Sequence, residues 1–197
     1  MRGILLILAL APALLVGCGD DDGETTVAIT ETVTEAETTE AGTAEGPQGE
    51  LTQRGIGSVE AGLTTAEVRA EFGPPDHERQ VPGCPLAGPN APPILQWTWE
   101  GTDGSTVLDF DVSSEKLVSY RTTSTELESA AGVRVGDPFQ ALRRGYGDQL
   151  QDLPLGAPAN ERVGLWYIGN PERLWQLFDL RGGKVRNIQG GDIQICE

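Results

Sequence analysis

Few residues in this sequence have the types and spacing that chemistry requires. Asp109 and Asp111 lie two positions apart on a predicted strand, so their side chains share one face. Two neighbouring carboxylates can act as general acid and general base, which makes an acid-dependent hydrolase one interpretation. Such a pair is more often the solvent side of a half-buried strand. The single histidine, His77, lies in a polar segment beside prolines, where a solvated loop side chain is expected.

Other catalytic patterns do not occur in the sequence. There is no Gly-x-Ser-x-Gly turn to expose a nucleophilic serine, and there is no glycine-rich phosphate-binding loop. No Cys-x-x-Cys spacing accompanies the single histidine, so we expect no metal site. We therefore predict that the protein is not an enzyme and has no catalytic residues and no cofactor.

The N-terminal segment predicts export. Met1-Arg2 gives a short basic start, and the apolar run from Ile4 to Val16 is too short to span a bilayer. The following Leu15-Val16-Gly17-Cys18 resembles the lipobox of bacterial lipoproteins. This resemblance implies a signal peptide at 1–17 and acyl chains such as palmitate on Cys18, at the extracytoplasmic face of the cell membrane. The alternative is an ordinary secretory signal followed by a chance cysteine.

With Cys18 assigned to lipid, two cysteines remain. In an exported protein the simplest interpretation of Cys84 and Cys196 is a disulfide, which would join the first loop to the end of the chain. Because the closed loop is long, the entropic model gives up to about 4–5 kcal/mol of stabilisation. Two free thiols or a metal site are the alternatives.

The segment at 18–50 predicts a disordered tether. Between Gly19 and Glu50 there is no Lys, Arg or aromatic residue, and ten acidic residues accompany many threonines. Such a composition buries too little apolar surface to offset the entropy of ordering. As a flexible coil its ends would lie roughly 30 Å apart. The formal net charge of the chain is −16, which excludes a basic footprint for nucleic acid and disfavours direct docking on an anionic membrane.

Two segments predict short helices, 62–73 and 136–147, which lie 74 residues apart in the chain. Each begins with the pattern of a capping box: Thr64 with Glu67, and Asp137 with Gln140. Each also has two apolar residues four positions apart on one helix face: Val68 with Phe72, and Leu142 with Tyr146. A short strand is expected before each helix, at 59–61 and 133–135.

Strands are predicted after each helix. Alternating residues indicate strands at 95–99, 108–112 and 116–120, with a hairpin turn at 101–104 and a loop at 74–93 before them. A similar pattern returns 68 residues later, where Phe178-Asp179-Leu180 corresponds to Phe110-Asp111-Val112. We therefore predict an α+β fold of two tandem helix–loop–antiparallel-sheet repeats, at 51–128 and 129–197, with the helices packed on one sheet face.

The pattern Gly-x-Thr-x-x-Glu-Val…Phe-Gly-x-Pro at 62–75 resembles the BamE-type (SmpA/OmlA) small lipoproteins. Two such units in tandem are similar in layout to the β-lactamase inhibitory protein. The second unit departs from the pattern, because Gly136-Asp137-Pro138 lacks the threonine and Asp148 replaces the proline after Gly147. The resemblance implies helices on one face of an antiparallel sheet, and protein binding instead of catalysis.

The second unit has apolar residues on both predicted sheet faces. Its expected outward residues are large and apolar where the first unit has Thr98, Glu100, Val107 and Asp109: these are Trp166, Ile168, Trp175 and Leu177. If residue 168 pairs with residue 173, Trp166 lies opposite Trp175. The four residues then form a partner-binding patch, unless they are buried against another part of the chain.

These observations favour a lipid-anchored cell-envelope protein that acts as a non-enzymatic protein-binding module, in envelope assembly or as an inhibitor. Its expected partner is an unidentified envelope protein. A small-ligand-binding lipoprotein is the alternative, which a closed pocket lined by Trp166 and Trp175 would favour. The acid-dependent hydrolase is the third interpretation.

Overall fold

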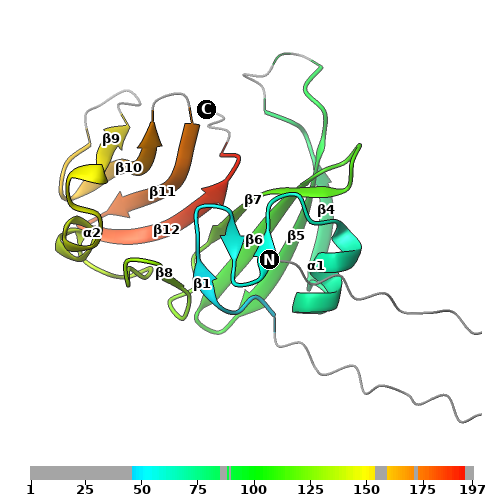
Figure 1. Cartoon of the computed structure of the whole chain (residues 1–197), viewed down its shortest axis with the longest axis horizontal. Helices are drawn as coiled ribbons and strands as arrows, with labels where there is room; N and C mark the ends of the chain where they lie inside the picture. The colour runs from blue at the N-terminus through cyan, green and yellow to red at the C-terminus, as the bar shows by residue number, and fades with distance from the viewer. Residues whose placement is uncertain (1–45, 85–87, 89, 154–158, 171–172, 194–197) are drawn as a thin grey trace, which may run out of the picture. The chain divides into compact units, whose positions relative to one another are not determined.

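An eight-stranded antiparallel sheet forms the centre of the structure (Figure 1). The computed structural model describes residues 46–84, 88, 90–153, 159–170 and 173–193. The strands run in the order β4-β5-β6-β7-β12-β11-β10-β9. Their bounds are β4 His77–Val81, β5 Ile94–Gly101, β6 Gly104–Asp111, β7 Lys116–Thr122, β9 Gln151–Leu153, β10 Val163–Asn170, β11 Arg173–Arg181 and β12 Lys184–Gly191.

The predicted fold class is wrong. The described residues are mostly β-structure, with an eight-stranded and a four-stranded sheet and two short helices, and they do not form two helix–loop–sheet repeats. The physical reason is the pairing of β7 with β12, from Ser119 opposite Gly191 to Thr122 opposite Ile188. These hydrogen bonds merge the strands that follow both helices into one continuous sheet. Pairing between strands so far apart in the chain leaves no local sequence pattern.

A second, four-stranded sheet of short strands has the order β3-β2-β1-β8. Its strands are β1 Glu50–Leu51, β2 Gly55–Ile56, β3 Val59–Glu60 and β8 Glu128–Ser129. Leu51, Ile56 and Val59 are fully buried in the core. The expected strand at 133–135 is reduced to one isolated bridge, in which Arg134 lies antiparallel to Glu128 of β8. Strand β8 itself is parallel to β1.

Both predicted helices form. Helix α1 spans Thr65–Phe72, and its capping box is confirmed, because Thr64 and Glu67 exchange side-chain and backbone hydrogen bonds. Helix α2 spans Phe139–Tyr146, but the capping box predicted from Asp137 and Gln140 is wrong. Pro138 is the N-cap, and the Asp137 carboxylate accepts the N–H of Arg134 instead. Neither of these eight-residue helices in the described residues is long and apolar enough to span a bilayer.

The two helices cover the same face of the large sheet (Figure 1). On α1, the Phe72 ring meets Trp99 of β5 edge-on at 5.9 Å. On α2, the ring centroid of Tyr146 lies 5.2 Å from that of Phe178 of β11. The strand register connects these contacts, because Trp99 and Phe178 lie in one cross-strand row that runs through Thr106, Thr122 and Ile188. Both helices therefore pack on one face of a single continuous sheet, and not each on the sheet of its own repeat as predicted.

Part of the segment predicted as a loop forms the edge strand β4. Residues His77 to Gln80 are exposed and polar on both faces of the strand, so no alternation is visible in the sequence. The strand still pairs over five residues with β5. Polar side chains are typical of edge strands because they discourage pairing with other chains.

One close approach in the covered face depends on a glycine. Gly190 of β12 lies directly opposite Tyr120 of β7. A Cβ atom at residue 190 would lie 2.4 Å from Cε1 and 2.7 Å from the hydroxyl oxygen of Tyr120. Because the tyrosine is almost fully buried, its ring has no free space into which it can move. The missing side chain of Gly190 is what allows the aromatic ring to lie across the sheet.

Gly190→Ala should lower the free energy of unfolding by about 1–3 kcal/mol, because the added methyl group overpacks the core against Tyr120. Urea denaturation of both proteins measures this change. In a Tyr120→Leu background the same substitution should cost less, since the atoms that it meets are gone. Equal losses in the two backgrounds would contradict this explanation.

Candidate functional site

A buried carboxamide lies at the centre of the described residues. Gln176 of β11 is 2% exposed. Its Oε1 accepts the hydroxyl hydrogen of Tyr146 at 3.0 Å, and its Nε2 donates to the hydroxyl of Tyr120 at 3.1 Å and to the carbonyl of Leu51 at 3.4 Å. The Tyr120 hydroxyl in turn donates to the carbonyl of Thr52 at 2.7 Å. These bonds join the large sheet, α2 and the chain after β1 in one polar network.

The network is electrically neutral. Burial raises the pKa of the Tyr120 hydroxyl far above its usual value, although the hydrogen bond with Gln176 acts in the opposite direction. Burial also raises the pKa of Tyr146, and a hydrogen bond with Ser129 partly opposes that rise. Both tyrosines therefore keep their hydroxyl hydrogens at neutral pH, so they donate as the geometry requires.

A cavity of about 320 Å³ lies against this network. Gln176 and Tyr146 form part of its lining, together with the buried apolar side chains of Leu51 and Ile168. The remaining lining residues are half-buried or exposed, and they are Thr52, Gln53, Arg54, Glu60 and Ala130. The cavity is therefore apolar and neutral on its buried side and carries one cation and one anion on its exposed side. Neither Trp166 nor Trp175 lines it, so this cavity is not the pocket around those two residues that would favour the small-ligand alternative.

A rigid turn carries the cation of this cavity. The N–H groups of Arg54 and Gly55 donate to Thr52 Oγ1 at 3.1 and 3.0 Å. The turn is also tied to neighbouring strands, because Gly191 N donates to the carbonyl of Gln53 at 2.9 Å. The Arg54 guanidinium lies on the exposed side with its Nε 3.2 Å from Glu60 Oε2.

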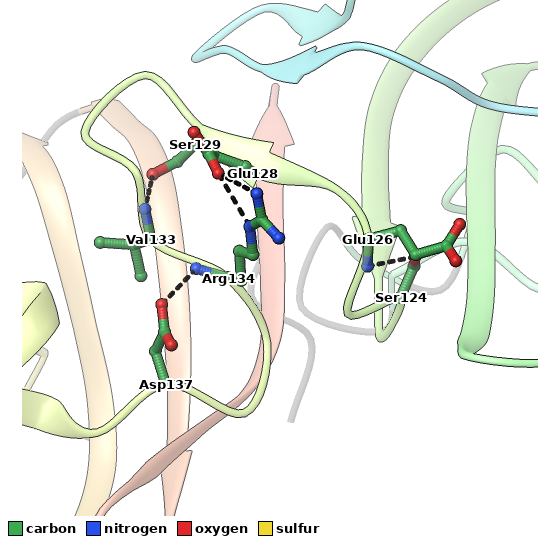
Figure 2. A network of polar contacts seen from close by, with 7 residues as sticks. All are labelled: Ser124, Glu126, Glu128, Ser129, Val133, Arg134 and Asp137. Atoms are coloured by element: carbon green, nitrogen blue, oxygen red, sulfur yellow. Dashed lines mark hydrogen bonds and ion pairs between the residues drawn. The ribbon is translucent and has the colours of Figure 1, made fainter.

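The segment between β7 and α2 holds a second polar network (Figure 2). Ser129, which is almost fully buried, accepts the N–H of Val133 at 3.1 Å through its hydroxyl. The Arg134 side chain pairs with Glu128, with Nε 2.8 Å from Oε2, and the Arg134 N–H donates to Asp137 at 2.9 Å. These contacts close the loop between β8 and α2, so we assign them a structural role.

The same connection begins with a turn that is held by a carboxylate. Asp103, in the turn between β5 and β6, accepts the N–H groups of Thr125 and Glu126 at 3.1 and 3.2 Å. The Ser124 hydroxyl bonds the same oxygen and lowers the pKa of Asp103. Figure 2 also shows the bond from Glu126 N to Ser124 Oγ at 3.2 Å.

The two carboxylates proposed for hydrolysis are both committed to structural hydrogen bonds. Asp109 accepts from Gln96 Nε2 at 2.8 Å and from the Ser119 hydroxyl at 3.1 Å. Asp111 accepts the hydroxyl and N–H groups of Ser113 and Ser114, and these bonds hold the pKa of Asp111 below its usual value. A carboxylate stabilised in its ionised form is a poor general acid, so this geometry does not favour a hydrolase.

His77 starts the edge strand β4 instead of lying in a loop, but it is exposed as expected. Its Nε2 lies 3.3 Å from Glu100 Oε1 on β5. Both side chains are largely in solvent, so the pair contributes little to stability.

The four residues predicted to bind a partner do not share one exposed face. Trp166 lies on the covered face, with its ring 4.7 Å from Phe139 of α2, and Ile168 is buried on the same face. Leu177 is buried as well, at 3% exposure, and pairs with Tyr167. Trp175 is 39% exposed. Of the four, Trp175 alone offers a large apolar surface to a partner.

The expected position of Trp166 opposite Trp175 is wrong. Trp166 pairs with Phe178, and residue 168 pairs with Gln176 instead of with Arg173. The cause is a bulge, because Gly169 pairs with Leu174 and the neighbouring Ile168 pairs with Gln176, which leaves Trp175 as the extra residue. A bulge of one residue reverses the faces inferred from simple alternation.

The cysteine predictions fall mostly outside the described residues. Cys18, Cys196, the predicted signal peptide and most of the predicted tether lie outside the residues that the structure describes. Cys84 is described and is buried at 7% exposure. The bond between Cys84 and Cys196 therefore stays a prediction, and so does the lipid on Cys18.

Sequence reasoning missed the network around Gln176. The sequence contains one indication of it, a glutamine inside the apolar run Leu174-Trp175-Gln176-Leu177-Phe178. A lone polar residue in such a strand requires a buried hydrogen-bond partner. The identity of its partners depends on strand pairs that are distant in sequence, so it could not be read in advance.

No family model matches this sequence, and no curated protein matches it. Solved structures that resemble it include YfeY of Escherichia coli, with a TM-score of 0.47 and 12% identity, over 72% of this chain and 99% of that one. An extracellular SCP-domain protein of Bacillus anthracis has a TM-score of 0.43 and 9% identity, over 66% of this chain and 43% of its own. This chain thus spans under half of that protein's length.

A candidate β-lactamase inhibitor protein of Streptococcus mutans also matches, with a TM-score of 0.28 and 9% identity, over 75% of this chain and 92% of its own. An inhibitor-like protein is therefore among the structural neighbours. Nothing in these comparisons supports the BamE-type resemblance. Because the TM-scores are below 0.5, we base no functional argument on them.

The raised pKa values of Tyr120 and Tyr146 predict a loss of stability in alkali. A tyrosine of the unfolded chain ionises near pH 10, whereas these two ionise at higher pH when folded. Above pH 10 the unfolded chain therefore holds fewer protons, and the free energy of unfolding falls by up to about 1.4 kcal/mol per pH unit for each tyrosine. Tyr120→Phe should reduce this slope.

Urea titrations at several pH values between roughly 9 and 12 measure that slope. The Tyr120→Phe variant should be less stable than the unmodified protein at pH 7, because Gln176 and Thr52 lose a partner. A pH slope that does not change on removal of the hydroxyl would contradict the assignment of a neutral, buried Tyr120.

Proposed function

We propose that this chain is a lipid-anchored, non-enzymatic protein-binding module of a cell envelope. The observation that carries the proposal is the exposed Trp175. Its side chain is 39% exposed on a bulge of β11, while the sheet around it is fixed by the buried Gln176. Tryptophan is the residue most enriched at the energetic centres of protein interfaces, because one rigid side chain buries a large area. A bulge next to a rigid strand is also a common way to aim such a side chain.

The charge of the chain supports a protein partner over a nucleic acid. With a net charge of −16, the molecule repels polyanions and anionic lipid surfaces. The lipid on Cys18 and the acidic tether would then hold the folded residues away from the membrane surface. This arrangement leaves Trp175 free to meet a partner in the envelope, either for assembly or for inhibition.

The polar side chains support binding instead of catalysis. Asp109 accepts hydrogen bonds from Gln96 and Ser119, serine donors stabilise the ionised state of Asp111, and His77 is solvated. The buried tyrosines are held neutral within the network around Gln176. Each of these groups already has a structural partner, so none is poised to exchange a proton with a substrate.

Trp175→Ala should abolish capture of the partner while leaving the fold intact. The partner is first identified by crosslinking in intact cells with the tethered protein as bait. An exposed tryptophan at a binding centre contributes about 2 kcal/mol or more of affinity, which is at least about 30-fold in the dissociation constant. Its truncation should shift the thermal midpoint little, because the side chain is partly in solvent.

Two further variants act as controls for this experiment. Val112→Ala removes an apolar side chain of comparable exposure, 37%, directly after β6, and this variant should capture the partner normally. Trp166→Ala should lower stability by about 2–4 kcal/mol, because its ring packs under α2. If Trp175→Ala captures the partner as well as Val112→Ala does, Trp175 is not the binding centre.

Cys18→Ala should leave an uncleaved or mislocalised precursor, because the substituted residue can accept no acyl chain. Fractionation of cells, followed by mass determination of the mature chain, tests this expectation. A variant that still matures and partitions with the membrane like the unmodified protein would contradict the lipid anchor and leave the binding hypothesis untouched.

A further inference from the structure

The cavity beside Gln176 has the features of a small-ligand site that is separate from Trp175. Its volume of about 320 Å³ is at the lower end of the usual range for ligand pockets. Leu51 and Ile168 supply apolar walls, and Gln176 and Tyr146 supply a floor whose polar atoms already bond to one another. Such an interior favours an uncharged, apolar body and disfavours a buried charge.

The exposed side of the cavity presents one guanidinium with unused donors. Arg54 Nε contacts Glu60 Oε2 at 3.2 Å. Within the part of the chain that the structure describes, the two Nη groups of Arg54 make no hydrogen bond or ion pair. An arginine held through Nε keeps its two terminal nitrogens in one plane, where they can bond both oxygens of a carboxylate. Glu60 therefore contacts Arg54 at Nε and leaves this end of the guanidinium open to solvent.

The backbone that carries this guanidinium is fixed before any ligand arrives. Thr52 Oγ1 accepts two N–H groups of its own turn, and Ala61 N donates to the carbonyl of Arg54 at 2.8 Å. Gly55 leaves no room for a side chain, because a Cβ there would lie 1.8 Å from the carbonyl oxygen of Val59. The backbone beneath Arg54 therefore needs no rearrangement when a ligand binds.

We propose that this cavity binds a small apolar monocarboxylate. The apolar body lies against Leu51 and Ile168, and the carboxylate bonds to the two Nη atoms of Arg54. One carboxylate matches the two free Nη groups of Arg54. A second charge on the ligand is disfavoured, because Gln176 and Tyr146 offer it no oppositely charged partner in the interior. This inference does not depend on the protein-binding role of Trp175, so either can fail without the other.

Isothermal titration of the full chain in detergent with 4-methylpentanoate tests the proposal. The matched probe is 4-methylpentanamide, which has the same shape and no charge. The acid should bind at least about tenfold more tightly than the amide, because a charge-assisted pair replaces a neutral contact. Amide chemical shifts of Gly55 and Ile168 should move on addition of the acid, which places the ligand in this cavity.

Variants then assign the contact. Arg54→Gln should weaken binding of the acid at least about tenfold and leave binding of the amide unchanged, whereas Arg54→Lys should weaken the acid less. Arg162→Gln, which removes an exposed arginine elsewhere, should change neither. Ala130→Leu narrows the cavity and should weaken both probes.

Equal affinity for the acid and the amide on the unmodified chain would overturn the carboxylate assignment, whatever the stability of the variants. No heat and no shift change at millimolar concentrations of either probe would overturn the ligand site as a whole. Acid binding that survives Arg54→Gln would show that another group holds the carboxylate and would also overturn the proposal. The thermal midpoint of each variant, measured alongside, distinguishes lost binding from lost folding.

Discussion

The structure depends on one buried carboxamide being fully hydrogen-bonded. Gln176 lies in the middle of an apolar strand, where an unsatisfied amide costs about 1–3 kcal/mol for each group left without a partner. Its partners come from three places that are distant in sequence: the Tyr120 and Tyr146 hydroxyls and the carbonyl of Leu51. Satisfying this one side chain therefore fixes the large sheet, α2 and the N-terminal strands relative to one another. A shift in the register of β11 would remove all three of these bonds from Gln176.

The candidate sites follow from that constraint. The tie between Gln176 and Leu51 holds the turn with Arg54 beside the sheet, which creates a cavity with a neutral interior and a charged entrance. On the same strand, Gln176 must face inward and Leu177 must pair with Tyr167, so the extra residue of the bulge is Trp175. Its exposure is thus a consequence of satisfying the carboxamide next to it. A binding role for Trp175 and a ligand role for Arg54 would both rest on the same rigid element.

The sequence alone predicts the local elements and misses the long-range ones. Both short helices follow from apolar residues four apart, and the capping box at Thr64 follows from hydrogen bonds between residues three apart. The pairing of β7 with β12 and the small sheet around Leu51 involve residues far apart in the chain, so no local pattern reports them. Strand β4 was missed because an exposed edge needs no alternation.

The residues of the candidate sites were also predicted only in part, because their positions depend on strand register and on distant partners. Trp175 was singled out from its size and its position on β11, and it is exposed. Trp166 was placed on the wrong face, because the bulge shifts the register by one residue and alternation cannot reveal it. The role of Gln176 was invisible, since a glutamine carries no indication of which distant groups it will bond.

Hydrogen exchange on the Gln176→Leu variant tests the central claim most directly. Leucine has a similar size to glutamine but cannot form the side-chain hydrogen bonds that join β11 to Leu51, Tyr120 and Tyr146. In this variant the amides at 51–61 should exchange at least about tenfold faster, while those of β5 and β6 keep their protection. Unchanged exchange at 51–61, or an equal acceleration across β5 and β6, would contradict the claim that this carboxamide holds the N-terminal strands in place.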